Sequence, residues 1–278
     1  MKTRTLPLSL VLTFSWFLAG GLHAAWLEVD DFNAIAFGPL NGHGGWTASS
    51  SVDVEDDGHG NRVASFRNIM PDGSPSDSKR FYKSATVPGG TTATLFFRIT
   101  AVGDVVRHYF GMTDKASPSD AMDLALCVRA TTHGDPDDGK YTLNMSEDGS
   151  FGSSLTADVD TWYNVWMVIR LSSSDRYNGY INSGYGSATW NDLQVSNAPL
   201  NYAAGGDLTK VLGVVEAQSP DWQVTNVWID DIYIDTSGEN FENPVIPEPA
   251  LLFIPVLSLF LARGSCRAWE PHRGPAPE

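Results

Sequence analysis

The chain has 278 residues, with 33 Asp+Glu against 18 Lys+Arg and a formal net charge of −15 at pH 7. This acidic balance excludes general nucleic-acid binding, because a phosphate backbone attracts proteins through lysine and arginine. The two cysteines, Cys127 and Cys266, are too few for a disulfide framework, so an apolar core must hold the fold together.

The N-terminal 25 residues have the organisation of a secretory signal peptide. Lys2 and Arg4 precede an apolar run over residues 6–18, and the segment ends on Ala24 and Ala25. The apolar run is too short to span a bilayer comfortably, which favours cleavage over a retained anchor. We therefore predict an exported protein. Without residues 1–25 and 250–278, 13 Lys+Arg stand against 31 Asp+Glu, a net charge of −18.

Residues 26–240 are predicted to form one all-β domain. Short segments of alternating apolar and polar residues follow one another, divided by Gly, Asp, Asn, Ser and Pro, and no stretch has a convincing helical period. About a dozen strands at this spacing predict a two-sheet antiparallel β-sandwich of the jelly-roll type. The predicted strands are residues 27–32, 52–55, 62–66, 92–101, 105–112, 122–129, 140–145, 161–171, 177–181, 208–216 and 224–235.

The clearest strand signal is residues 161–171. Every second residue is apolar, whereas the residues between them are rings and polar groups. This alternation predicts a central strand with one face in the core and the other toward solvent or a ligand. The predicted core face consists of Tyr163, Val165, Met167, Ile169 and Leu171.

Several short phrases resemble concanavalin A-like (laminin G-like) domains of exported bacterial proteins. They are Asp31-Phe32, Leu40-Asn41-Gly42 with Gly45-Trp46, Gly60-Asn61, Trp162-Tyr163-Asn164-Val165-Trp166 and Trp228-Ile229-Asp230-Asp231-Ile232-Tyr233. The resemblance implies a fold with a concave sheet that often meets glycans. It does not imply an activity.

The C-terminal part divides into three short segments. Residues 241–249 form a linker with the motif Pro247-Glu248-Pro249, residues 250–262 are apolar, and residues 263–278 form a basic and proline-rich tail. Thirteen apolar residues make a helix only about 20 Å long, which is shorter than the core of a bilayer.

This order of segments resembles the PEP-CTERM sorting signal of Gram-negative bacteria. Pro247, Glu248 and Pro249 match its motif, and Arg263 and Arg267 match its basic cluster. The resemblance implies recognition by an exosortase, association with the membrane through residues 250–262 before processing, and a location in the cell envelope or exopolysaccharide matrix. The apolar run is short and the chain continues over residues 268–278, which departs from the family pattern.

No catalytic residue is predicted. A retaining glycosidase on this fold needs two carboxylates that face one sugar, as in the Glu-x-Asp-x-x-Glu pattern of the related glucanases. The nearest match, residues 28–33, lacks the last Glu. Asp230 and Asp231 are adjacent and are predicted to face opposite sides of a strand. The sequence therefore favours a non-catalytic protein over a divergent glycoside hydrolase or polysaccharide lyase.

Four aspartates suggest a structural calcium site. If the first strand pairs with the last, Asp30 and Asp31 approach Asp230 and Asp231, and like charges destabilise a sheet unless a cation lies between them. Calcium prefers such oxygen ligands, although the acids could equally point into water. A second acidic stretch, residues 135–139, is better explained as a solvated turn.

A ligand-binding surface is predicted on the outward faces of the central strands. Aromatic rings stack on sugar faces, and guanidinium groups bind carboxylate or sulfate through two hydrogen bonds. The alternative is a sheet surface covered by a loop, with its arginines paired to local acids. The predicted ligand residues are Phe96, Arg98, Arg107, Tyr109, Arg129, Trp162, Asn164, Trp166 and Arg170.

These features predict a glycan-binding protein of the cell exterior, with extracellular polysaccharide as its partner. A structural matrix protein without a specific ligand is the third hypothesis.

Overall fold

The computed structural model describes residues 26–50, 52–68, 79–103, 107–133, 138–172, 174–184, 186–202, 204, 206–216 and 225–245. One compact unit ends at Asn243, and a second unit, Pro244–Glu278, lies almost wholly outside these residues. The predicted signal peptide and the sorting residues Pro247, Glu248, Pro249, Arg263 and Arg267 also lie outside them.

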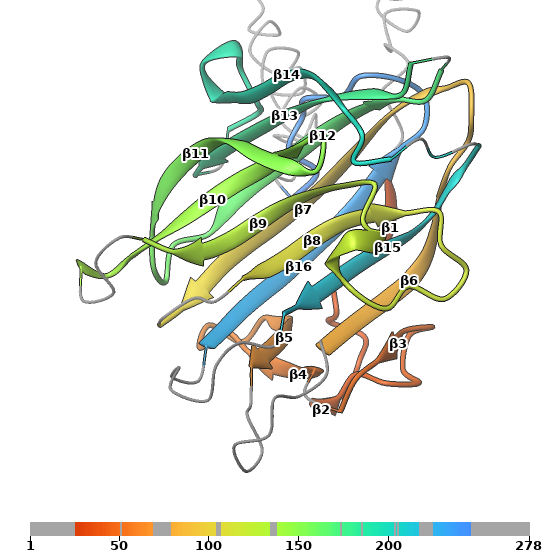
Figure 1. Ribbon diagram of the computed structural model, residues 1–278. Coiled ribbons are helices and arrows are strands. Elements are labelled where there is room, and N and C mark those ends of the chain that lie inside the picture. Colours follow the sequence, from red (N-terminus) through yellow and green to blue (C-terminus); the bar gives the residue numbers. More distant parts are fainter. Residues whose placement is uncertain are drawn as a thin grey trace, which may run out of the picture. The chain divides into compact units, whose positions relative to one another are not determined.

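The described chain folds into two antiparallel sheets that pack face to face, which confirms the predicted all-β sandwich (Figure 1). We call the nine-stranded sheet sheet A. Its strands are, in spatial order, β14 (Leu193–Pro199), β13 (Arg176–Ser183), β12 (Tyr163–Arg170), β7 (Thr92–Val102), β16 (Thr225–Asp235), β5 (Arg62–Asn68), β4 (Val52–Asp56) and β2 (Gly38–Pro39), with β1 (Leu27–Asp30) paired to β16.

The seven-stranded sheet, sheet B, forms the other layer. Its strands are β11 (Ser150–Asp158), β10 (Lys140–Glu147), β9 (Leu126–Thr132), β8 (His108–Thr113), β15 (Leu208–Val215), β6 (Lys79–Val87) and β3 (Thr47–Ala48). Two 3-10 turns, η1 (Ala121–Asp123) and η3 (Trp190–Asp192), lie in connections between strands.

Every predicted strand has a counterpart, but β2, β3, β6, β11 and β14 are additional. β11 is an edge strand of sheet B, and alternate residues along it are exposed to solvent. Its sequence is therefore rich in Ser and Gly and has little apolar alternation. The strand predicted at 122–129 begins only at Leu126, because Asp120 caps η1 by accepting a hydrogen bond from the Met122 N–H at 2.8 Å. Local capping therefore replaces strand structure in this segment.

The core lies between the two sheets and includes the predicted face of β12. All five apolar residues of that face belong to the main buried cluster, and Met167 is fully buried between its strand partners Leu95 and Gly179. Rings from both layers meet there, with the Phe97 and Phe110 centroids 4.6 Å apart. The alternation in residues 161–171 thus gave the correct inward face.

Chain segments near both ends of the domain cover the outer face of sheet A. Trp26 packs edge-on against Phe96, and Trp166 Nε1 donates to the Glu242 carbonyl at 3.1 Å. The Phe241 ring lies 5.1 Å from that of Tyr180. Residues 236–243 therefore lie over the sheet and shield the outward side chains of β12 and β13.

Truncating the core face of β12 tests this packing. We expect Met167→Ala to lower the free energy of unfolding by about 2–5 kcal/mol, because it leaves a cavity between the sheets. Met122→Ala is the matched control, since Met122 on η1 is 82% exposed and its loss should cost less than about 0.5 kcal/mol. Urea denaturation measures both, and equal midpoints for the two variants would contradict the assignment of Met167 to the core.

Candidate functional site

Three of the predicted ligand residues are buried on the outer face of sheet A. Trp166 and Phe96 are fully buried, and Asn164 is 3% exposed and donates to the Gly184 carbonyl at 2.6 Å. They form no open, ring-lined surface, because the N-terminal Trp26 and residues 236–243 occupy the space above them. This arrangement corresponds to the alternative of a sheet covered by a loop.

Two predicted arginines on this face are already paired with acids. Arg98 lies 2.9 Å from Asp231 and packs over the Trp162 ring, with 4.6 Å between the guanidinium carbon and the ring centroid. Arg170 lies 2.5 Å from Glu239 in the covering segment. Both guanidinium groups are thus committed to the protein itself, so the predicted anionic-glycan surface does not form on β7 and β12.

A β-bulge brings Asp230 and Asp231 to the same face of β16. Asp230 pairs with Arg98 and Tyr233 with Phe96, so three residue steps on β16 match two on β7. Asp231 has φ 52°, a left-handed conformation that accommodates the extra residue. Asp230 is the cross-strand partner of Arg98, and Arg98 Nη1 lies 2.9 Å from Asp231 Oδ2. The expectation that these neighbours face opposite sides is therefore wrong, because it assumed an unbroken strand.

The predicted pairing of the first and last strands is present, but the four aspartates do not converge. Asp30 accepts hydrogen bonds from Lys83 Nζ and Trp46 Nε1, both at 2.7 Å, whereas Asp231 pairs with Arg98. Within the described ranges, no group of three or more His, Cys, Asp or Glu side chains could hold a metal ion. The donor set does not fit calcium, because Lys83 and Arg98 supply the positive charge that was expected from the ion.

The buried carboxyl pair holds a proton at neutral pH. Burial, followed by the charge of Asp231, raises the pKa of Asp230 to about 8. Asp230 Oδ2 accepts from Asn61 Nδ2 at 2.6 Å, whereas its buried Oδ1 has no hydrogen-bond partner among the described residues. Asp230 is only 1% exposed and Asp231 only 8%, so the pair does not present the two open carboxyl groups that a retaining glycosidase needs.

The raised pKa makes stability depend on pH. Above pH 3.8, the ordinary pKa of an aspartate, Asp230 loses its proton in the unfolded chain but keeps it in the folded protein. The free energy of unfolding therefore falls as the pH rises from 3.8 to about 8. We expect Asp230→Asn to raise the melting temperature at pH 8–9 and to change it little near pH 4. Asp148→Asn, at an exposed turn residue, is the control. The same change of melting temperature with pH in both variants would contradict the raised pKa of Asp230.

The outer face of sheet B brings three predicted ligand residues together. Tyr109 on β8 is the direct partner of Arg129 on β9, and Arg129 is the partner of Asn144 on β10. Arg107 precedes Tyr109 by two residues and lies 3.4 Å from Glu216. We call this group the sheet B cluster; its members are Arg107, Tyr109, Arg129, Asn144, Phe151 and Glu216.

Arg129 is the unusual member of the sheet B cluster. Its guanidinium carbon lies 3.9 Å from the centroid of the Phe151 ring. Among the described residues, the guanidinium donates one long hydrogen bond, 3.4 Å, to Asn144 Oδ1, and its buried Nε has no hydrogen-bond partner. Among the four predicted arginines, it alone has no carboxylate partner in the described part of the chain. A buried donor without a partner is costly, so Arg129 has hydrogen-bonding capacity left for an anion.

Tyr109 and Glu216 define the polar edge of the sheet B cluster. Burial, followed by the charge of Glu216, raises the pKa of Tyr109 far above its ordinary value. The hydroxyl therefore stays protonated at neutral pH. Burial also raises the pKa of the neighbouring Cys127 thiol to about 12, which leaves it unreactive.

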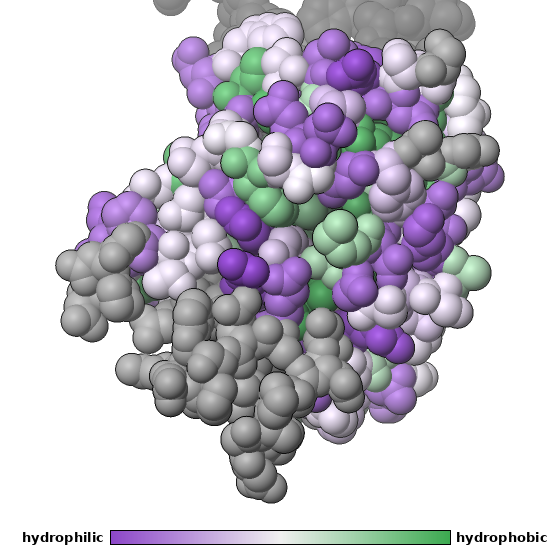
Figure 2. Space-filling view, viewed as in Figure 1, coloured by the Kyte–Doolittle hydropathy of each residue, from purple (hydrophilic) through white to green (hydrophobic). Residues whose placement is uncertain are grey.

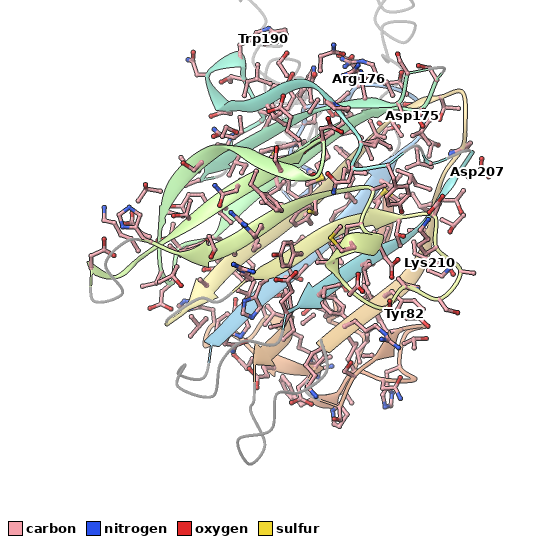
Figure 3. The ribbon with its side chains drawn as sticks, viewed as in Figure 1. Tyr82, Asp175, Arg176, Trp190, Asp207 and Lys210 are labelled. Atoms are coloured by element: carbon pink, nitrogen blue, oxygen red, sulfur yellow. The ribbon has the colours of Figure 1, made fainter. Side chains whose placement is uncertain are left out.

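Apolar side chains border these polar groups. Leu124, Cys127, Leu212 and Val214 form a small buried cluster with Tyr109, against which Tyr82 and Phe151 pack. Figure 2 shows apolar surface in the middle of this side of the molecule with hydrophilic residues around it. Tyr82 and Lys210 lie on the same side in Figure 3.

The sequence analysis did not predict three members of the sheet B cluster: Asn144, Phe151 and Glu216. Asn144 and Glu216 fall within predicted strands, but only the pairing of β8, β9, β10 and β15 aligns them with Arg129 and Tyr109. Phe151 lies on β11, which was not predicted. The sequence signal that could have found Phe151 is a lone aromatic residue after the turn at residues 148–149.

In the part of the chain that the structure describes, no helix is long and apolar enough to cross a membrane. No protein-family model matches the chain, and no curated protein sequence matches it significantly.

Solved structures share its architecture at low identity. The catalytic domain of the glycoside hydrolase family 131 protein from Coprinopsis cinerea is 12% identical, with a TM-score of 0.47 over 71% of this chain and 86% of that chain. The carbohydrate recognition domain of Emp47p is 10% identical, with a TM-score of 0.48 over 79% of this chain and all of that one. The exoplasmic/lumenal domain of VIP36, in its Ca2+/Man2-bound form, is 12% identical, with a TM-score of 0.41 over 79% and 88%. Scores this low transfer no function, which must come from the side chains of this chain.

Proposed function

We propose that this protein is exported and binds acidic polysaccharide through the sheet B cluster. The observation that carries the proposal is Arg129, a partly buried guanidinium without a carboxylate partner among the described residues. Guanidinium groups bind carboxylate and sulfate through two parallel hydrogen bonds, so a uronate or a sulfated sugar is the matching ligand class.

The neighbours of Arg129 suit such a ligand. Asn144 supplies an amide beside the guanidinium, and Phe151 and Tyr109 supply ring surface, with 5.9 Å between their centroids. The Glu216 charge is countered by Arg107, which lies 3.4 Å away, and this leaves Arg129 as the positive group of the cluster without a carboxylate partner among the described residues. Residues 26–249 have a net charge of −18, which repels an acidic polymer. The contact of the ligand with Arg129 must overcome this repulsion.

A polysaccharide lyase is the second candidate, because Tyr109, Arg129 and Asn144 lie side by side. Such an enzyme needs a base that removes a proton beside the uronate carboxylate. The raised pKa of Tyr109 makes it a poor base at neutral pH, and this observation favours binding over catalysis. Release of unsaturated uronate from polygalacturonate, followed by ultraviolet absorbance, would reverse this preference.

The proposal includes sorting to the cell envelope of a Gram-negative bacterium. It rests on the resemblance of residues 245–267 to a PEP-CTERM signal, which implies an exosortase-type enzyme as partner and a membrane-bound stage before processing. A glycan-binding domain and a sorting tail together suit a component of the exopolysaccharide matrix.

Arg129→Ala tests the binding site. We expect its affinity for polygalacturonate and for a sulfated glycan to fall about tenfold or more, since hydrogen bonds to charged groups contribute about 1.5–3 kcal/mol. Arg170 lies on sheet A, and its guanidinium is already paired with Glu239. The Arg170→Ala variant should therefore bind the glycan as the wild type does. Affinity electrophoresis measures both variants. Equal retention of Arg129→Ala and wild type, or no retention of the wild type, would refute the site.

Glu248→Ala tests sorting. If Pro247-Glu248-Pro249 is a recognition element, the variant should accumulate in the membrane fraction with the full mass of its C-terminal segment. Glu270→Ala, which lies beyond the apolar segment, should be processed normally. Fractionation followed by mass spectrometry distinguishes the two, and identical mass and fractionation of Glu248→Ala and wild type would contradict the sorting proposal.

A further inference from the structure

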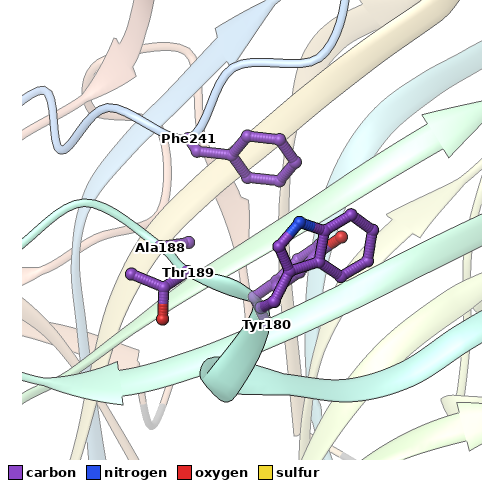
Figure 4. Close-up of a pocket in the computed structure, with 5 residues that line it drawn as sticks. Tyr180, Ala188, Thr189 and Phe241 are labelled. Carbon is purple, nitrogen blue, oxygen red and sulfur yellow. The ribbon is translucent and has the colours of Figure 1, made fainter.

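A second candidate site lies at the edge of sheet A, where an open pocket with a cavity volume of about 60 Å³ is lined by Tyr180, Ala188, Thr189, Trp190 and Phe241 (Figure 4). Trp190 is 77% exposed, although most of the large aromatic residues of the described chain are buried. Figure 3 shows it at the top of the molecule. Tyr180 is the strand partner of Trp166 on sheet A, whereas Tyr109 and Arg129 lie on sheet B, so the pocket is separate from the sheet B cluster.

The turn that carries Trp190 is tightly fixed. The Thr189 N–H and hydroxyl both donate to Asp192 Oδ2 at 2.7 Å, and Thr189 Oγ1 accepts from the Asn191 N–H. This reciprocal capping fixes η3, the 3-10 turn in which Trp190 is the first residue. The Ala188 N–H donates to the Phe241 carbonyl at 2.9 Å, which joins the turn to the covering segment. An exposed indole on a fixed turn is preorganised for a ligand.

Ring faces are the main feature that the pocket offers. Tyr180 is 2% exposed and lies at its base, with its ring inclined at 66° to Trp190 and 74° to Phe241. Because these contacts are edge-to-face, Tyr180 does not stack on the indole. The exposed indole therefore keeps ring surface for an apolar group.

The chemistry of the lining selects the occupant. The five lining residues include no Asp, Glu, Lys, Arg or His. An acidic or basic ligand would therefore find no counter-charge among them. Pockets that enclose drug-sized ligands have volumes of about 300–1,000 Å³, so this pocket of about 60 Å³ does not enclose a ligand and suits one face of a single ring in a longer chain. We propose that it binds the apolar face of a neutral sugar ring, in a glycan that passes along the edge of sheet A.

Trp190→Ala tests this site in the purified protein. The probes are neutral cello-, manno- and xylo-oligosaccharides, measured by isothermal titration calorimetry and by quenching of tryptophan fluorescence. We expect the affinity of Trp190→Ala to fall about tenfold, which corresponds to loss of one stacking contact, whereas Trp190→Phe should keep part of it. Phe37→Ala is the matched control, because Phe37 is an exposed aromatic residue, 56% accessible, outside the pocket.

The outcomes separate this site from the sheet B cluster. Arg129→Ala should leave neutral oligosaccharide binding unchanged, and Trp190→Ala should leave the binding of polygalacturonate through Arg129 in place. The inference is wrong if the wild type binds none of the neutral probes or if Trp190→Ala binds them as the wild type does. It is also wrong if Trp190→Ala changes only self-association in sedimentation velocity, since the occupant would then be a second copy of the chain.

Discussion

The last strand, β16, joins three parts of the chain that are far apart in sequence. Its first half pairs with β5, its second half with β1, and its other edge with β7 along nearly its whole length. Burial of Val227, Ile229, Ile232 and Ile234 against sheet B stabilises these pairings. The bulge at Asp231 lies where the partner changes from β5 to β1. It keeps the isoleucines on both sides in the core while it turns two adjacent carboxyl groups outward.

The charges near this junction are neutralised within the protein. Lys83 pairs with Asp30, Arg98 pairs with Asp231, and Asp230 keeps its proton because burial disfavours its charged form. These pairs stabilise the junction of β1, β7 and β16 without a metal ion among the described residues. Their burial also explains why so acidic a cluster presents little open carboxylate to a ligand.

The two outer faces of the sandwich have different roles. On sheet A, Trp26 and residues 236–243 cover the rings and engage Arg170, and the aromatic pocket remains only at the edge. On sheet B, the described chain leaves the Arg129 guanidinium with a single long hydrogen bond. The two proposed contacts, a charged one on sheet B and an uncharged ring contact at the edge of sheet A, lead us to propose a heteropolymer with both acidic and neutral sugars as the ligand.

The sequence by itself determined the fold class, most of the strands and the inward face of β12, because a period of two is a local property of the chain. The β1–β16 pairing entered the sequence analysis only as the condition of the calcium hypothesis, and the structure contains it. Tertiary structure alone decided which outward faces are covered, since Glu242 reaches Trp166 across 76 sequence positions. It also decided the bulge at Asp231 and the strand registers that place Asn144 and Glu216 beside Arg129 and Tyr109. A one-residue change of register moves every side chain to the opposite face, and no local pattern fixes a register between distant strands.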